Sequence, residues 1–148
     1  MGQLFQEKDF VGHSGENLHW KIEMDALSYA EWKCIARMIL PYTEHTPFRE
    51  VIGIPRGGRI LADVLHNSSS RNTSDPYLIV DDVLTTGGSM EEFRKTNPKI
   101  QGKDCIGWVV FARVQPPSWV SALFQMPRKW VDNPNSPEYH DGHCPLVP

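Results

Sequence analysis

A run near the middle of the chain, residues 77–89, combines the pattern of a buried strand with two acids and a glycine-rich turn. Four apolar residues open the run, Asp81 and Asp82 follow, and the remainder is rich in threonine and glycine. Open α/β sheets bind ligands at the carboxyl ends of their strands. Glycines there let the backbone approach an anion, and hydroxyls and helix amides donate hydrogen bonds to it. The alternative is a plain strand–turn–helix in which the acids merely cap the turn.

Apolar runs with the length of buried strands alternate along the chain with amphipathic, helix-like segments. Such alternation predicts an α/β fold with a mainly parallel sheet flanked by helices. The strand patterns cover residues 18–24, 51–54, 77–80, 105–111 and 120–125, and the helical patterns cover residues 28–40, 59–66 and 89–93. Ser28 and Glu31 have the spacing of a capping box at the start of the first helix, and Ser89 stands at the start of the third.

The whole run at residues 77–89 resembles the phosphoribosyl-pyrophosphate (PRPP) motif of the type I phosphoribosyltransferases, in its apolar residues, its acids and its Thr/Gly/Ser loop. The resemblance implies the fold of that family, with a small N-terminal hood. It places Asp81 and Asp82 as catalytic residues beside the ribose hydroxyls, where acids favour the positive charge that builds on the ribose ring. The residues that it assigns to the 5′-phosphate of PRPP are Thr85, Thr86, Gly87, Gly88 and Ser89.

A second glycine-rich turn, residues 53–58, follows the first buried strand of the predicted sheet and precedes a helical segment. It resembles the pyrophosphate-binding loop of the same family. Backbone amides in such a turn can surround phosphate oxygens, and an arginine adds positive charge. The residues that the resemblance assigns to pyrophosphate are Pro55, Arg56, Gly57 and Gly58. Turns of this composition are common, and the match gains weight from its order and spacing relative to residues 77–89.

Residues 13–18, with the strand pattern that follows them, resemble in part the N-terminal hood of orotate phosphoribosyltransferases. Leu18 stands where that hood has a second serine, and a plain hairpin is the alternative. The resemblance makes Lys21 and Arg113 candidates for binding the acceptor base, and the fork of an arginine suits a carboxylate. For Arg113 the alternative is an exposed arginine at a strand end that binds nothing.

The interval at residues 67–76 departs from the family pattern. Catalytic members usually place two strands and a long basic lid there, whereas this interval holds only ten residues. Its serines and asparagines predict a mobile surface loop. Arg71 is the one basic residue in the interval, which makes it the candidate substitute for the charge of the lid.

Charge and composition exclude other classes of protein. Lys and Arg number 15 against 18 Asp and Glu, so the net charge is −3 and no basic nucleic-acid-binding surface is expected. No apolar run approaches the roughly twenty residues of a membrane span, and three cysteines make no complete disulfide framework. These features predict a cytoplasmic protein without a nucleic-acid or membrane partner. The His/Cys cluster at residues 140–144 lacks a second ligand pair, and no residue is assigned as a direct metal ligand.

The length of 148 residues predicts one domain. We expect a phosphoribosyltransferase-like domain at residues 1–131, with the hood at residues 1–27. The segment that follows, residues 132–148, is rich in proline. Proline removes backbone donors and interrupts regular elements, so this segment is expected to be an irregular tail.

The resemblance implies transfer of the 5-phosphoribosyl group from PRPP to a nucleobase-type acceptor, orotate being one such base, with release of pyrophosphate. Mg²⁺ would accompany PRPP, because hydrated magnesium normally handles a dense run of phosphate charges. Positioning and charge stabilisation would carry the rate without a covalent nucleophile. Homodimers are common in the family, so a homodimer is a candidate assembly. The alternative is a non-catalytic, PRPP- or nucleotide-binding regulator that has lost the catalytic lid.

Overall fold

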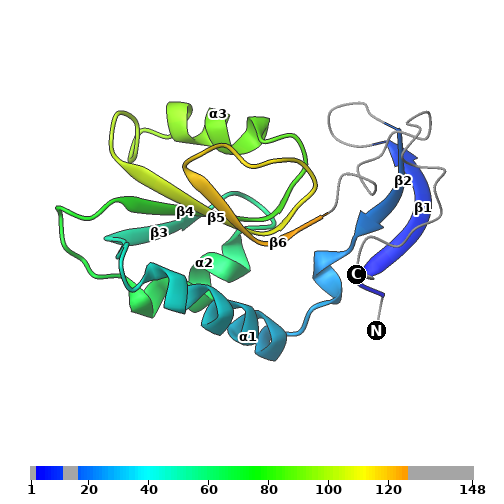
Figure 1. The fold of residues 1–148 in the computed structure, drawn as a ribbon, viewed down its shortest axis with the longest axis horizontal. Helices are drawn as coiled ribbons and strands as arrows, with labels where there is room; N and C mark the ends of the chain where they lie inside the picture. The colour runs from blue at the N-terminus through cyan, green and yellow to red at the C-terminus, as the bar shows by residue number, and fades with distance from the viewer. Residues whose placement is uncertain (1–2, 12–16, 127–148) are drawn as a thin grey trace.

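The computed structural model describes residues 3–11 and 17–126. Within them a parallel four-stranded sheet has the order β3–β4–β5–β6, formed by Glu50–Gly53, Tyr77–Leu84, Cys105–Ala112 and Val120–Gln125. Helices α1 (Tyr29–Ile39) and α2 (Arg59–Leu65) cover one face, and α3 (Gly88–Thr96) covers the other (Figure 1). This arrangement confirms the predicted α/β fold with a parallel sheet flanked by helices.

Three short 3-10 helices connect these elements: Met24–Ala26, Leu40–Thr43 and His66–Ser68. No helix among the described residues is long and apolar enough to cross a membrane. The predicted tail at residues 132–148, with its His/Cys cluster, lies outside the described residues, as does most of the segment 13–18.

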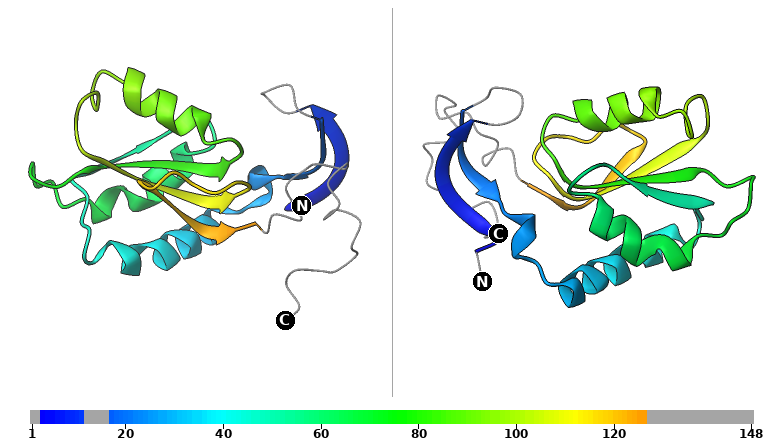
Figure 2. Two further views of the ribbon diagram at one scale, coloured as in Figure 1. Left: turned by 45° about the horizontal axis from the view of Figure 1, so that its top comes forward. Right: turned by 180° about the vertical axis from the view of Figure 1, so that it is seen from behind.

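An antiparallel hairpin of β1 (Phe5–Val11) and β2 (Asn17–Ile22) lies beyond the end of the sheet at which β6 finishes (Figures 1 and 2). The Phe5 ring meets the Phe111 ring edge-on at 5.8 Å between centroids, and Phe111 stacks on Phe124 at 5.2 Å. These aromatic contacts tie the hairpin to the carboxyl ends of β5 and β6. The strand predicted at residues 18–24 ends at Ile22, since a 3-10 helix begins at Met24.

Helix α1 begins where the capping-box pattern predicts. The Ser28 hydroxyl accepts a hydrogen bond from the Glu31 N–H at 3.3 Å, and the Glu31 carboxylate accepts one from the Ser28 N–H at 3.2 Å. Its buried face consists of Trp32, Ile35, Ala36 and Ile39. Burial of a large apolar side chain is worth about 1.5–3 kcal/mol, so this face anchors α1 to the sheet.

Strand β4 is longer than predicted and passes through both acids. Strand β3 ends at Gly53, opposite Val80, whereas β4 continues to pair with β5 as far as Leu84 opposite Ala112. A strand needs only one partner to continue, so the change to polar residues after Val80 does not end β4. The acids therefore lie just beyond the last residue of β3, at the carboxyl edge of the sheet.

Candidate functional site

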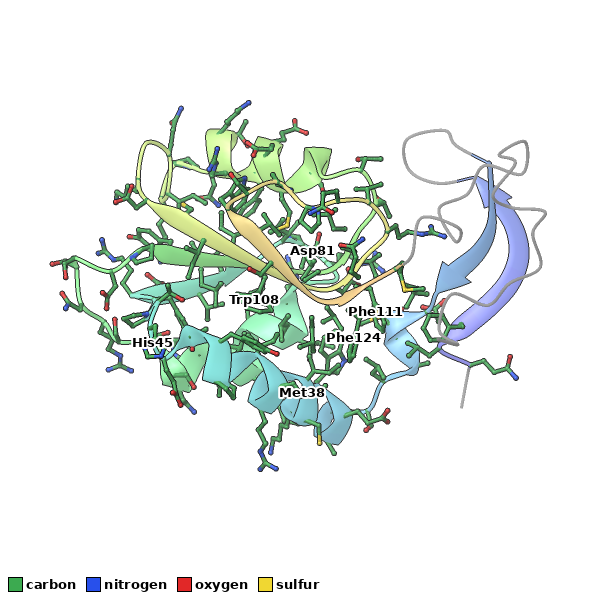
Figure 3. All side chains as sticks on the ribbon, in the orientation of Figure 1. Met38, His45, Asp81, Trp108, Phe111 and Phe124 are labelled. Atoms are coloured by element: carbon green, nitrogen blue, oxygen red, sulfur yellow. The ribbon has the colours of Figure 1, made fainter. Side chains whose placement is uncertain are left out.

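The two acids are held side by side by the backbone of β4. Asp81 is buried at 9% exposure, and Asp82 is half-buried. The Asp82 N–H donates to Asp81 Oδ1 at 2.9 Å, and the Val83 N–H donates to Asp82 Oδ1 at 2.7 Å. Figure 3 shows Asp81 inside the sheet layer, closer than His45 to the end that faces the hairpin. Neighbouring amides therefore fix both carboxylates at the edge where α/β sheets bind ligands.

Burial makes the charged form of Asp81 unfavourable. Burial first, and then the negative charge of Asp82, raise the pKa of the Asp81 carboxyl from its usual 3.8 to about 8. The hydrogen bond from the Asp82 N–H opposes this change by stabilising the carboxylate. Asp81 is consequently a buried acid that a positively charged ligand would help to ionise.

The glycine-rich turn at residues 53–58 lies directly against the end of β4. The Ile54 N–H donates to the Val80 carbonyl at 2.9 Å, and the Gly58 N–H donates to the Ile54 carbonyl at 2.9 Å. A Cβ at Gly53 would lie 2.3 Å from the Gly58 carbonyl oxygen, and one at Gly58 would lie 2.3 Å from the Val80 carbonyl oxygen. Only glycine fits at these two positions because the obstructing atoms belong to the backbone.

The same turn contacts the acidic pair through Gly57. A Cβ built there would lie 2.3 Å from Asp82 Oδ2, so the Gly57 backbone rests on the Asp82 carboxylate. The turn that the resemblance assigns to pyrophosphate and the acids that it assigns to the ribose are thus brought together. Nothing in the spacing of the two segments along the chain indicates this contact.

The second turn, residues 85–89, leads from β4 into α3. Gly87 is the N-cap residue and has a positive φ of 81°, which glycine adopts without steric cost. The helix begins at Gly88, whose N–H donates to the Thr86 hydroxyl at 3.4 Å, so the predicted capped start at Ser89 is wrong. The first amides of an α-helix lack intrahelical acceptors and face outward along its axis. An anion is a suitable acceptor for them.

Two substitutions in this turn are expected to differ in effect. Gly87→Val would force a β-branched residue into the left-handed region, at a cost of about 1–2 kcal/mol, so it tests folding as much as binding. In Gly88→Ala the added Cβ would contact only Thr86 Oγ1, at 3.6 Å, so this variant should fold normally. If the backbone touches a phosphate, Gly88→Ala should weaken PRPP binding about tenfold in calorimetry, with an unchanged melting temperature. Unchanged affinity would mean that the segment is only a turn.

The link between β5 and β6 borders this turn, which the sequence did not indicate. A Cβ at Gly87 would lie 3.9 Å from Pro117 Cδ, and the Trp119 indole N–H donates to Glu91 Oε1 on α3. The Arg94 guanidinium lies 4.5 Å from the centre of the Trp119 ring. This link therefore packs against the start of α3 and supports the turn at residues 85–89. Trp119 thus packs against α3 through both its ring and its indole N–H.

Arg113 directly follows β5 and is buried at 5% exposure. Its backbone N–H donates to the Leu84 carbonyl at 2.9 Å, which places it beside the end of β4. The alternative of an exposed strand-end arginine is therefore wrong. The backbone of Lys21 pairs with Gln6 in the hairpin, whereas the Lys21 side chain lies outside the described part of the structure.

Arg71 lies at the wrong end of the sheet to replace a lid. Its backbone N–H donates to the Arg49 carbonyl at 3.2 Å, and Arg49 directly precedes β3. The loop leads from α2 to the start of β4, so it lies at the amino edge, whereas the acids lie four and five residues further along β4. At about 3.3 Å per residue, that is some 13–16 Å from the start of the strand. Arg71 therefore does not lie where it could replace the charge of the lid, and that prediction is wrong.

Internal hydrogen bonds also close the same loop. The Ser70 hydroxyl donates to Asp75 Oδ2 at 2.5 Å, and the side-chain oxygen of Asn72 accepts a hydrogen bond from the Ser74 N–H at 3.1 Å. The serine and asparagine side chains, from which a mobile loop was predicted, therefore form the hydrogen bonds of its turns.

Comparison with solved structures identifies the fold. The chain aligns with an orotate phosphoribosyltransferase from Aeropyrum pernix at a TM-score of 0.64 and 16% identity, over 83% of this chain and 88% of that one. It aligns with the Leishmania donovani UMP synthase at 0.68 and 15% identity, over 83% of this chain and 34% of that one. A purine phosphoribosyltransferase from Pyrococcus horikoshii aligns at 0.52 and 18% identity, over 68% and 86% of the two chains.

No protein-family model matches the chain, and no curated protein matches it either. The identities to the solved structures are low, so these likenesses bear on the fold. They agree with the PRPP motif at residues 77–89 and with the pyrophosphate-loop pattern at residues 53–58. The fold that the resemblance implies is thereby confirmed, and the chain has the type I phosphoribosyltransferase fold.

Proposed function

We propose that the chain binds PRPP and transfers its 5-phosphoribosyl group to a nucleobase-type acceptor, releasing pyrophosphate. The observation that carries this proposal is the contact of one glycine-rich turn with an acidic pair on a strand that leads directly into a second glycine-rich turn. The turn at residues 53–58 rests on Asp82, and the turn at residues 85–89 follows the same strand. One ligand with a diphosphate at one end, a phosphate at the other and hydroxyls between them suits this order.

In this proposal each end of PRPP has its own turn. The backbone N–H groups of Arg56 and Gly57 bind the diphosphate, and the Arg56 side chain adds positive charge beside it. The turn at residues 85–89 and the first amides of α3 bind the 5′-phosphate. The ribose then lies over Asp81 and Asp82, whose oxygens accept hydrogen bonds from its hydroxyls.

The acids would act electrostatically. As pyrophosphate leaves, positive charge builds on the ribose ring, and fixed negative groups nearby stabilise that state more than the ground state. Asp81 would share this role where the positive charge of an accompanying Mg²⁺ favours its ionised form.

Mg²⁺ fits this arrangement as a companion of PRPP. Magnesium is commonly held by substrate phosphates and water together with few protein oxygens. The ion would neutralise charge on the departing diphosphate. Asp81 and Asp82 would supply negative charge close to the hydrated ion.

An orotate-like base is the acceptor that we propose. Arg113 supports this choice because it is buried beside the end of β4, and a guanidinium fork suits a carboxylate. Two of the similar structures described above, an orotate phosphoribosyltransferase and a UMP synthase, also favour it.

A non-catalytic PRPP-binding regulator is the second candidate, favoured by the position of residues 67–76. This loop lies at the amino edge, so within the described residues it places no basic group over the diphosphate. Lids exclude water and complete catalytic sites. Pyrophosphate release from PRPP and Mg²⁺, measured across a panel of orotate, uracil and purine bases, distinguishes the candidates. Base-dependent release supports the enzyme, whereas PRPP binding without release from any base supports the regulator.

Arg71→Ala is expected to leave both PRPP affinity and any turnover unchanged within about twofold. The reason is its place beside Arg49 at the amino edge. The same calorimetric and pyrophosphate-release assays measure the effect, with Arg56→Ala as the matched variant that should weaken binding. A loss of turnover in Arg71→Ala would show that this loop reaches a site, for instance that of a second copy of the chain.

A further inference from the structure

Gly57 differs from the other glycines of its turn in what surrounds it. A Cβ at Gly57 would lie 2.3, 2.4 and 2.5 Å from Oδ2, Cγ and Oδ1 of Asp82. The carboxylate therefore occupies the volume that a side chain at Gly57 would fill. At Gly53 and Gly58 the obstructing atoms belong to the backbone of the turn and of β4.

The Asp82 carboxylate is thus held from two directions. The Val83 N–H donates to its Oδ1 at 2.7 Å, and the Gly57 backbone lies against the whole carboxyl group. The first contact comes from β4 itself, and the second comes from the turn at residues 53–58. Gly57 has no positive φ, so alanine is compatible with its backbone conformation. A methyl group at this position would collide with a side chain that can rotate away.

We propose that Gly57 is a positioning residue, which holds the Asp82 carboxylate in the orientation that faces the ribose of bound PRPP. This inference rests on the proposed function for its catalytic consequence. The absence of a side chain at residue 57 lets the pyrophosphate turn and the acid share one surface. A single added methyl group separates them by displacing Asp82, while the amides of the turn stay in place.

The first test is a double-mutant cycle on stability, using Gly57→Ala, Asp82→Ala and the double variant. Asp82→Ala removes all three atoms that a methyl group at residue 57 would meet. Gly57→Ala should lower the melting temperature by about 3 °C with Asp82 present, and should have no measurable effect in the Asp82→Ala background. Equal losses in both backgrounds would overturn the proposed contact.

The second test separates catalysis from binding. Gly57→Ala should lower kcat for pyrophosphate release about tenfold, and should change the calorimetric Kd for PRPP–Mg²⁺ less than about threefold. The matched variant Gly88→Ala should instead weaken the binding of PRPP–Mg²⁺ about tenfold, because Gly88 belongs to the turn assigned to the 5′-phosphate and its Cβ would meet no atom closer than 3.6 Å. A Gly57→Ala protein with wild-type kcat would overturn the positioning role.

The two tests keep the inference separate from the proposed function. If the wild-type chain releases no pyrophosphate with any base, the enzyme proposal fails, and the stability cycle alone decides whether Gly57 holds Asp82. If the wild type is active and the cycle shows no coupling, the proposed function stands and the inference fails. A crystal structure of Gly57→Ala should show Asp82 rotated from its position, and an unmoved Asp82 would contradict the inference directly.

Discussion

Replacing both acids, as Asp81→Asn with Asp82→Asn, should abolish phosphoribosyl transfer and leave the fold intact. Asparagine keeps the volume of aspartate and removes its charge, so the sheet edge can stay packed. Stabilisation of the charged ribose would be lost, and removal of comparable electrostatic groups in enzymes costs about 100–1,000-fold in kcat. We therefore expect a fall of at least about 100-fold in base-dependent pyrophosphate release.

Circular dichroism and thermal unfolding check the fold of this double variant, and pyrophosphate release checks its activity. Asp104→Asn is the matched control, since Asp104 is an exposed acid directly before β5, at the opposite edge of the sheet. It should retain full activity. Full activity in the double variant would contradict the role that we assign to the pair.

Asp81→Asn alone should stabilise the ligand-free protein at pH 8. Burial and the charge of Asp82 raise the pKa of Asp81 to about 8, whereas the unfolded chain has an ordinary value near 3.8. Between these values the folded state binds the proton more tightly, so wild-type stability falls as the pH rises from about 4 to about 8. A difference of one pKa unit between the folded and unfolded states corresponds to about 1.4 kcal/mol. The variant is therefore expected to be more stable than the wild type above pH 8, where the folded wild type carries the buried charge.

Urea unfolding of wild type and Asp81→Asn at pH 5 and pH 8 measures this effect. The stability advantage of the variant should be larger at pH 8 than at pH 5. At pH 5 the folded wild type keeps Asp81 protonated, so most of the cost of burying its charge is absent. Equal advantages at both values would show that Asp81 ionises normally in the folded protein. A stabilising substitution that removes activity would be typical of an acid retained for function.

Much of the fold follows from local sequence patterns. The capping box at Ser28 and Glu31 determines the start of α1, and the short apolar runs marked all four strands of the parallel sheet. These features depend on neighbours a few residues apart, which a sequence displays directly. The length of β4 did not follow, because its continuation to Leu84 depends on pairing with β5.

The candidate site was predictable as a set of segments and not as a geometry. The acids and both glycine turns were visible as motifs, whereas the contact between Gly57 and Asp82 joins residues far apart in the chain. Arg71 was misplaced because composition identifies a charged residue and does not tell at which edge of the sheet its loop lies. The burial of Arg113 likewise depends on the neighbouring end of β4.

Titration calorimetry with PRPP and Mg²⁺ tests the central claim most directly. We predict saturable binding of one PRPP per chain, with competition from pyrophosphate and from ribose 5-phosphate, because each occupies one of the two turns. Gly88→Ala should weaken the binding of PRPP and of ribose 5-phosphate, and should leave that of pyrophosphate unchanged. Absence of PRPP binding to the folded wild-type chain would contradict the account, and would leave the motif at residues 77–89 with a structural role only.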